Sequence, residues 1–231
     1  MTEDIAASEP VEPVGPASDR IRVRRKPGRA HYDRATIDAI LDAALVGHIG
    51  WVLDDQPYVT PITIWRTGDR LYWHGSAGSR MVQATKAGAP VCITATILDG
   101  LVLARSGTNH SMNFRSVMVL GSAHAVEDET EALAALEAFI EHLFPGRPAE
   151  LRPTTSKEVR ATTVLWLDLT ESSAKVRAEG SHEEPGDESW PAWAGVVPVG
   201  LVAGAPEPDE HVLAGMEPPA YLPRAGEPLE R

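Results

Sequence analysis

The feature that most constrains the fold is a series of short apolar segments separated by turn-forming residues. The segments lie at residues 47–53, 57–65, 70–75, 90–98, 101–106, 115–126 and 162–169. Turns as short as Asp54-Asp55-Gln56 favour antiparallel hairpins, because parallel strands need longer crossover connections. The pair Asp99-Gly100 is a typical two-residue hairpin turn and predicts that 90–98 and 101–106 are separate strands.

Helical periodicity interrupts this strand pattern at three places. Asp33 is expected to be the N-cap of a helix that ends at Gly47, and a short helix is expected over 79–87. Residues 129–143 alternate an apolar face with glutamates, and Phe144-Pro145-Gly146 follows them. The pattern therefore predicts a mainly β, α+β fold: a small closed antiparallel barrel with flanking helices.

The net charge of −12 is concentrated at the two ends of the chain. Residues 1–19 are predicted to be a disordered acidic tail, and residues 179–231 a proline-rich acidic extension with 190–200 packed on the barrel. The near-neutral body, 20–178, has the size of one domain. A chain with this charge has no overall field to attract nucleic acid, and its basic cluster at 20–29 lacks aromatic residues for base stacking.

Other sequence features indicate the compartment. The single cysteine, Cys92, excludes an intrachain disulfide and suits a reducing compartment. The first residues lack a secretory signal, and the longest apolar stretch, 194–205, is too short to cross a bilayer. A cytoplasmic protein without a membrane partner is expected.

A glycine- and serine-rich stretch from Tyr72 to Arg80 is the first candidate for chemistry. Small residues at 75–79 let backbone amides approach an anion, and Arg80 follows at an expected helix start. The stretch is neither a Walker A loop nor a dinucleotide fingerprint. It predicts phosphate binding, with a plain strand-to-helix turn as the alternative.

A second polar cluster lies at 109–116, immediately before a long apolar strand. Arg115 can bind a phosphate with both arms of its guanidinium, while Asn113 and Ser116 can satisfy a ring edge rich in heteroatoms. The alternative is a capped turn in which Arg115 forms a surface salt bridge.

Motifs for other catalytic chemistry are absent from the sequence. The eight histidines are scattered without HExxH, no GxSxG occurs, and Cys92 lies in an apolar strand that suits a structural thiol. His74 adjoins the glycine-rich stretch, so it is a candidate catalytic residue, with a structural histidine as the alternative. No metal site is predicted.

Several motifs in the same order resemble the split-barrel flavoproteins related to pyridoxamine 5'-phosphate oxidase, and most closely the nitroimidazole-resistance-type branch. The resemblance covers about residues 20–200. It is carried by Leu71–Met81, Pro90–Ser106, His110–Met118, Val23-Arg24-Arg25 before Tyr32-Asp33, Ser173–Arg177 and Trp193–Pro198. Phe114 stands where this branch usually has tyrosine.

The resemblance implies a six-stranded antiparallel split barrel that forms a homodimer with one FMN in each of two interfacial grooves. Thr60, Pro61, Ile62 and Thr63 would lie along the isoalloxazine ring. His74, Ser79 and Arg80 would face the ribityl phosphate. Asn113, Arg115 and Ser116 would complete the site, and Trp190 and Trp193 would cover the flavin or bury the dimer seam, with surface packing of a tail as the alternative.

The expected function is that of an FMN-dependent oxidoreductase that passes electrons from NAD(P)H or another reductant to a small molecule, for example a nitroaromatic. Such a protein positions and tunes the cofactor, so no acid–base pair is required. The alternative is a non-catalytic flavin carrier or sensor, or a barrel that binds haem or a deazaflavin. His74 or His110 would then be the axial ligand of a haem.

Overall fold

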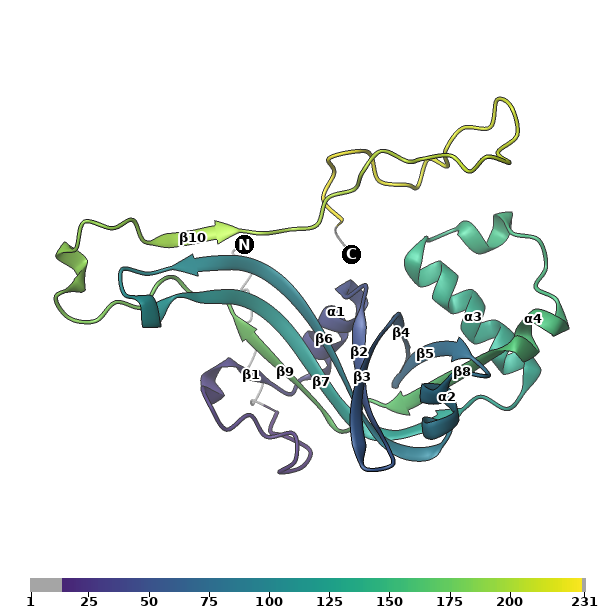
Figure 1. Cartoon of the computed structure of the whole chain (residues 1–231), viewed down its shortest axis with the longest axis horizontal. Helices are drawn as coiled ribbons and strands as arrows, with labels where there is room; N and C mark the ends of the chain where they lie inside the picture. Colours follow the sequence, from purple (N-terminus) through teal and green to yellow (C-terminus); the bar gives the residue numbers. More distant parts are fainter. Residues whose placement is uncertain (1–13, 230–231) are drawn as a thin grey trace, which may run out of the picture.

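The computed structural model describes residues 14–229 and contains one strongly curled antiparallel sheet flanked by helices (Figure 1). Strands pair in the order β3-β2-β6-β7-β8-β5-β4, while β9 pairs with β1 and β7, and β10 pairs with β6. The strands are β1 (Ala30–His31), β2 (Gly47–Leu53), β3 (Gln56–Ile62), β4 (Ile64–Thr67), β5 (Arg70–Ser76), β6 (Ala87–Leu103), β7 (Ser111–Ala125), β8 (Thr162–Asp168), β9 (Ser172–Arg177) and β10 (Gly195–Pro198). The predicted antiparallel split barrel with flanking helices is confirmed.

Each α-helix begins at a residue whose side chain caps its N-terminus. They are α1 (Arg34–Ala43), α2 (Arg80–Thr85), α3 (Glu129–Leu143) and α4 (Ser156–Ala161), joined by the 3₁₀ turns η1 (Pro27–Arg29), η2 (Gly107–Asn109), η3 (Arg147–Glu150) and η4 (Asp187–Ser189). The Asp33 carboxylate accepts from Thr36 N at 2.8 Å, as predicted, and these hydrogen bonds lower the pKa of Asp33. Asp128 and Ser79 cap α3 and α2 in the same way.

The turn predicted at Asp99-Gly100 is wrong. Strand β6 runs through this pair with only a shift of register between Leu98 and Gly100, and the chain reverses later, around η2. The cause is the close approach of β10, because a Cβ on Gly100 would lie 3.0 Å from a methyl carbon of Val196. Gly100 therefore serves a bulge in a long strand beside β10.

The barrel core and a second apolar cluster lie on opposite sides of β5. Leu71 and Trp73 point into the barrel, whereas Tyr72 packs with Trp65 in the cluster beneath α3. This alternation follows from the two-residue period of a strand. The next residue of the α3-facing row is His74, so the register of β5 places this imidazole outside the barrel core.

Residues 199–229, here called the C-terminal arm, follow β10. Figure 1 shows the arm leaving the sheet and extending above α3. Its two ends pair with each other: Ala203 N donates to Glu227 O at 2.9 Å, and Leu229 N donates to Leu201 O at 3.0 Å. The arm is therefore a long closed loop.

At the other end of the chain, most of the acidic tail predicted to be disordered, residues 1–13, lies outside the described residues. In the remainder, Ser18 Oγ donates to the Glu171 carboxylate at 2.6 Å. Within residues 14–229, no helix has the length and apolar character needed to span a membrane.

Candidate functional site

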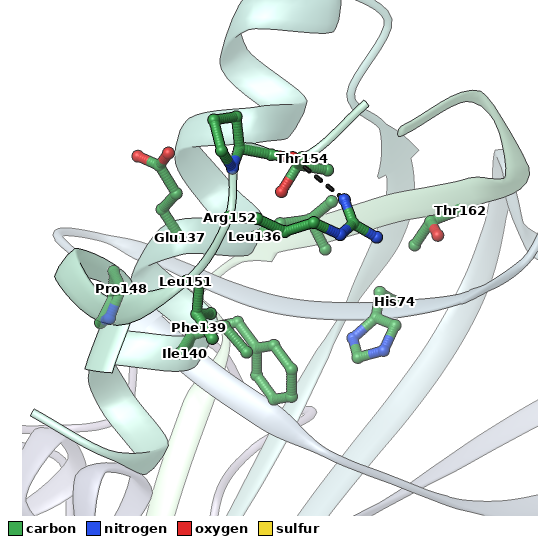
Figure 2. Close-up of a pocket in the computed structure, with 11 residues that line it drawn as sticks. His74, Leu136, Glu137, Phe139, Ile140, Pro148, Leu151, Arg152, Thr154 and Thr162 are labelled. Atoms are coloured by element: carbon green, nitrogen blue, oxygen red, sulfur yellow. Dashed lines mark hydrogen bonds between the residues drawn. The ribbon is translucent and has the colours of Figure 1, made fainter. Parts of the chain in front are cut away.

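His74 lines a cavity between the sheet and α3, here called the His74 cavity (Figure 2). Its ring centroid lies 4.8 Å from that of Phe139 and 5.8 Å from that of Trp65. The cavity has a volume of about 510 Å³ and is lined by His74, Leu136, Glu137, Phe139, Ile140, Pro148, Leu151, Arg152, Pro153, Thr154 and Thr162. This volume falls within the range of small-molecule and cofactor sites.

The imidazole of His74 is neutral and partly unsatisfied. Its Nδ1 is buried without a hydrogen-bond partner in the described part of the chain. Burial among apolar groups lowers the pKa of His74, because desolvation disfavours the charged ring. A neutral imidazole whose nitrogen lacks a protein partner is suited to bind a metal ion or a ligand donor.

One wall of the His74 cavity is the loop between α3 and α4. Residues Arg147–Thr154 of this loop, here called the cap, include η3 and contribute five of the lining residues. In Figure 2, the guanidinium of Arg152 lies above the cavity near Thr154. Arg152 Nη1 donates to the Glu158 carboxylate at 3.0 Å, and this ion pair lowers the pKa of Glu158.

Arg115 lies in a different cavity, here called the Arg115 cavity, of about 740 Å³. Its guanidinium pairs with the Asp99 carboxylate at 2.8 Å, and this hydrogen-bonded pair raises the pKa of Arg115. The cavity is lined by Ala43, Ala44, Leu45, Val46, His48, Thr96, Ile97, Leu98, Asp99, Arg115, Val199, Gly200, Leu201, Pro228 and Leu229. The charge of Arg115 is thus already balanced, and the base of the C-terminal arm forms one wall.

Arg80 is placed beside β3 rather than beside Arg115. Its guanidinium carbon lies 5.6 Å from the ring centroid of Tyr58, which in turn stacks on Trp51 at 4.6 Å. Trp51 Nε1 donates to Thr60 Oγ1 at 3.0 Å. Among residues 14–229, no carboxylate forms a salt bridge with Arg80, so this exposed cation remains available to an anionic ligand.

The structure brings some of the predicted site residues together and separates others. Thr60, Pro61 and Ile62 lie on β3, Thr63 follows directly, and contacts through Trp51 and Tyr58 connect Thr60 to Arg80, which Ser79 precedes. His74 instead faces α3, on the opposite side of β5 from Gly75, whose added Cβ would meet Val82 of α2. His74 and the Arg80 cluster therefore belong to two places.

The remaining predicted residues have structural partners. The buried Asn113 accepts from the Arg177 guanidinium and from Glu179 N through its Oδ1, and Ser116 Oγ donates to Lys175 O at 3.3 Å. Trp193 is 65% exposed, and its ring lies against Gly195. His110, the second candidate ligand, is exposed, and its Nδ1 lies 3.0 Å from Ser106 O at the tip of the β6–β7 hairpin.

Sequence reasoning missed the groups that build the His74 cavity. The α3 side chains Leu136, Phe139 and Ile140 belong to the apolar face predicted for residues 129–143, and the cap carries no motif. A signal was available: Trp73 and His74 are consecutive residues of one strand, so they must face opposite sides of the sheet.

Comparison with known proteins identifies the family. The family model described as pyridoxamine 5'-phosphate oxidase matches residues 33–176. The chain belongs to the pyridoxamine 5'-phosphate oxidase family. Among curated proteins no match was found.

Two solved structures of this family resemble the chain over most of its length. The flavocytochrome Anf3 from Azotobacter vinelandii is 42% identical, with a TM-score of 0.84 and coverage of 89% of this chain and 95% of its own. An FAD- and haem-binding protein from Mycobacterium smegmatis is 33% identical, with a TM-score of 0.83 and coverage of 88% and 100%.

The resemblance to the nitroimidazole-resistance branch is more distant. A proposed 5-nitroimidazole antibiotic resistance protein from Bacteroides thetaiotaomicron is 24% identical, with a TM-score of 0.55 and coverage of 64% of this chain and 86% of its own. This likeness shows the shared fold alone. Within the family, the flavocytochrome and the FAD- and haem-binding protein are more similar to the chain.

Proposed function

We propose that this protein binds a flavin and a haem and exchanges electrons between them, with His74 as a ligand of the haem iron. The observation that carries the proposal is the buried, unpartnered imidazole nitrogen of His74 in a cavity of about 510 Å³. The relatives with 42% and 33% identity, a flavocytochrome and an FAD- and haem-binding protein, support it.

The residues of the His74 cavity suit a haem in two respects. His74 supplies a neutral nitrogen donor, as the proximal ligand of many haem proteins does. Leu136, Phe139, Ile140 and Leu151 supply apolar contact surface, whereas Arg152 at the cavity mouth is already paired with Glu158. Burial lowers the pKa of His74 and so favours the neutral ring, which has a lone pair for iron.

The flavin is proposed to lie along β3, with its first phosphate at Arg80. The ring would lie beside Thr60, Pro61 and Ile62 of β3 and the following Thr63, and no carboxylate of residues 14–229 forms a salt bridge with Arg80. The flavin ring and its first phosphate are common to FMN and FAD. FMN is the flavin expected from the sequence. Acid extraction followed by chromatography of the released flavin distinguishes the two.

The proposed reaction class is electron transfer from NAD(P)H or another reductant to a small acceptor. When bound, a flavin takes two electrons as a hydride and a haem iron exchanges one electron at a time, so together they connect the two kinds of chemistry. A nitroaromatic acceptor has weaker support, because the relative that suggests it shares only the fold.

We also propose a homodimer. Val197 of β10, Leu101 of β6 and Met112 of β7 form an exposed row across three adjacent strands. The chain exposes 15130 Å², whereas a compact protein of its mass exposes about 10,000 Å². Burial of this row against a second copy of the chain would reduce the excess, as in stable homodimers.

The dimer is tested by sedimentation of the variant Leu101→Glu/Met112→Glu, with Val52→Glu as the control, since Val52 is an exposed apolar residue on a different hairpin. The double variant should sediment as a monomer and the control as a dimer. A monomeric wild-type protein would contradict the proposal.

The cofactor assignment is tested by the absorption spectrum of the purified protein, before and after addition of hemin. A Soret band together with flavin absorption is expected. His74→Ala should lower hemin affinity by at least a hundredfold, whereas the control His110→Ala should leave it unchanged. A wild-type protein that binds no hemin, or a His74→Ala variant that binds it normally, would refute the haem assignment.

A further inference from the structure

The backbone hydrogen bonds of the cap over the His74 cavity are local, and its Arg152 side chain pairs with Glu158 of α4. Arg147 N donates to Phe144 O at 2.9 Å, and Leu151 N donates to Pro148 O at 3.2 Å. These bonds shape η3 but do not tie it to the sheet. Because Pro148, Leu151, Arg152, Pro153 and Thr154 form one side of the cavity, movement of the cap would open it.

Tyr221 of the C-terminal arm binds this cap. Its hydroxyl donates to Glu150 Oε2 at 2.9 Å and accepts from Arg147 Nη1 at 3.2 Å. Arg147 Nη1 also donates to the same Glu150 oxygen at 2.9 Å, which closes a triangle of three polar groups. The hydroxyl thus completes a charge-assisted network on η3, and its hydrogen bond is the main cause of the raised pKa of Arg147.

The same arm is fixed at its other end to the Arg115 cavity. Val199 N donates to Asp99 O at 3.1 Å, and Val199, Gly200 and Leu201 line that cavity with Pro228 and Leu229. From this base the chain extends over α3, as Figure 1 shows, and places Tyr221 on the cap. One segment therefore touches the walls of both cavities.

We propose that Tyr221 is a positioning residue that holds the cap over the His74 cavity, so that the C-terminal arm controls how readily a haem enters and leaves. This inference rests on the proposed function for the identity of the ligand. The closure itself rests on the contacts of Tyr221 with Arg147 and Glu150.

The test compares Tyr221→Phe with Tyr32→Phe. Both changes remove one hydroxyl, but the Tyr32 hydroxyl accepts from Val23 N at 2.9 Å near the start of the domain and does not touch the cap. Amide hydrogen exchange of residues 144–155 reports cap opening without any cofactor. Transfer of hemin from the loaded protein to excess apomyoglobin reports the rate of haem loss.

Tyr221→Phe should accelerate both exchange in the cap and hemin loss by about tenfold, the factor that corresponds to one hydrogen bond to a charged group. Tyr32→Phe should change neither. Unchanged exchange in Tyr221→Phe overturns the inference, and faster exchange with unchanged hemin loss overturns the claim that the cap controls the ligand. If the wild type binds no hemin, the proposed function fails, and the exchange measurement alone decides whether Tyr221 holds the cap.

Discussion

The His74 cavity and the Arg115 cavity contrast in how their polar groups are satisfied. In the first, the His74 imidazole lies among Phe139, Trp65 and other apolar groups, and its Nδ1 has no partner within residues 14–229. In the second, the guanidinium of Arg115 already pairs with Asp99. Because an unpaired buried polar group costs free energy, His74 gains more from a ligand than Arg115, whose guanidinium already has a partner.

The same comparison distinguishes Arg115 from Arg80 as candidate ligands of the flavin phosphate. The sequence suggests either a phosphate ligand or a salt bridge for Arg115. In the structure Arg115 forms a salt bridge with Asp99. Arg80 has no carboxylate partner within residues 14–229 and lies over Tyr58 beside β3. Arg80 is therefore the better candidate for the phosphate ligand.

The largest expected effect tests whether satisfied polar groups are structural. Asn113→Ala should lower the free energy of unfolding by about 2–3 kcal/mol, because it removes an acceptor from the buried guanidinium of Arg177. Denaturant titration measures the change. The control Ser116→Ala, which removes a single hydroxyl donor, should cost less than about 1 kcal/mol. Normal stability of Asn113→Ala with loss of flavin would instead make Asn113 a ligand residue.

A smaller effect, on flavin affinity, is expected when Arg80 or Arg115 is replaced by alanine. Arg80→Ala should weaken flavin binding by about tenfold, because it removes a charge-assisted contact to phosphate. Arg115→Ala should weaken it less, since Asp99 already occupies its guanidinium, and the double variant should bind flavin little more weakly than Arg80→Ala alone. Fluorescence titration with FMN and with FAD measures both. A larger loss from Arg115→Ala would move the phosphate to the Arg115 cavity.

The smallest expected effect is a pH dependence of stability. Burial lowers the pKa of His74 in the folded protein, so below about pH 6.5 the unfolded chain binds a proton that the folded chain resists. The free energy of unfolding of the cofactor-free protein should therefore fall as the pH drops from about 6.5 towards the lowered pKa. His74→Phe should reduce this fall.

Urea denaturation at pH 7.5 and 5.5 measures the effect. The control is His110→Phe, which alters an exposed ring. An identical pH dependence in His74→Phe and wild type would show that His74 is not held neutral by its surroundings.

Much of the fold could be predicted from local signals. The helix at residues 129–143 has the predicted bounds, since its apolar face and the following proline and glycine are local features. The β2–β3 turn was also predicted, and both Asp54 and Asp55 adopt positive φ there, as a tight hairpin turn requires. The hairpin turn predicted at Asp99-Gly100 is wrong because the strand that packs there, β10, lies about a hundred residues later in the chain.

The candidate site was less predictable, because it depends on which distant segments meet. Thr60 and Arg80 were singled out, but their link through Trp51 and Tyr58 depends on sheet register and helix placement. The contact between Tyr221 and Glu150 joins residues 71 positions apart in a segment without any recognisable motif. Contacts of this kind produce no periodic pattern in the sequence, so they cannot be predicted from it.

The alternation of β5 makes strand register a condition of function. Trp73 faces the barrel and His74 faces α3, so a slip of β5 by one residue against β4 and β8 would exchange them. The imidazole would then be sealed inside the barrel, and the indole would fill the cavity beneath α3. The pairing of Ile64 with Trp73, and of His74 with Val164, thus determines whether the imidazole is available to a ligand at all.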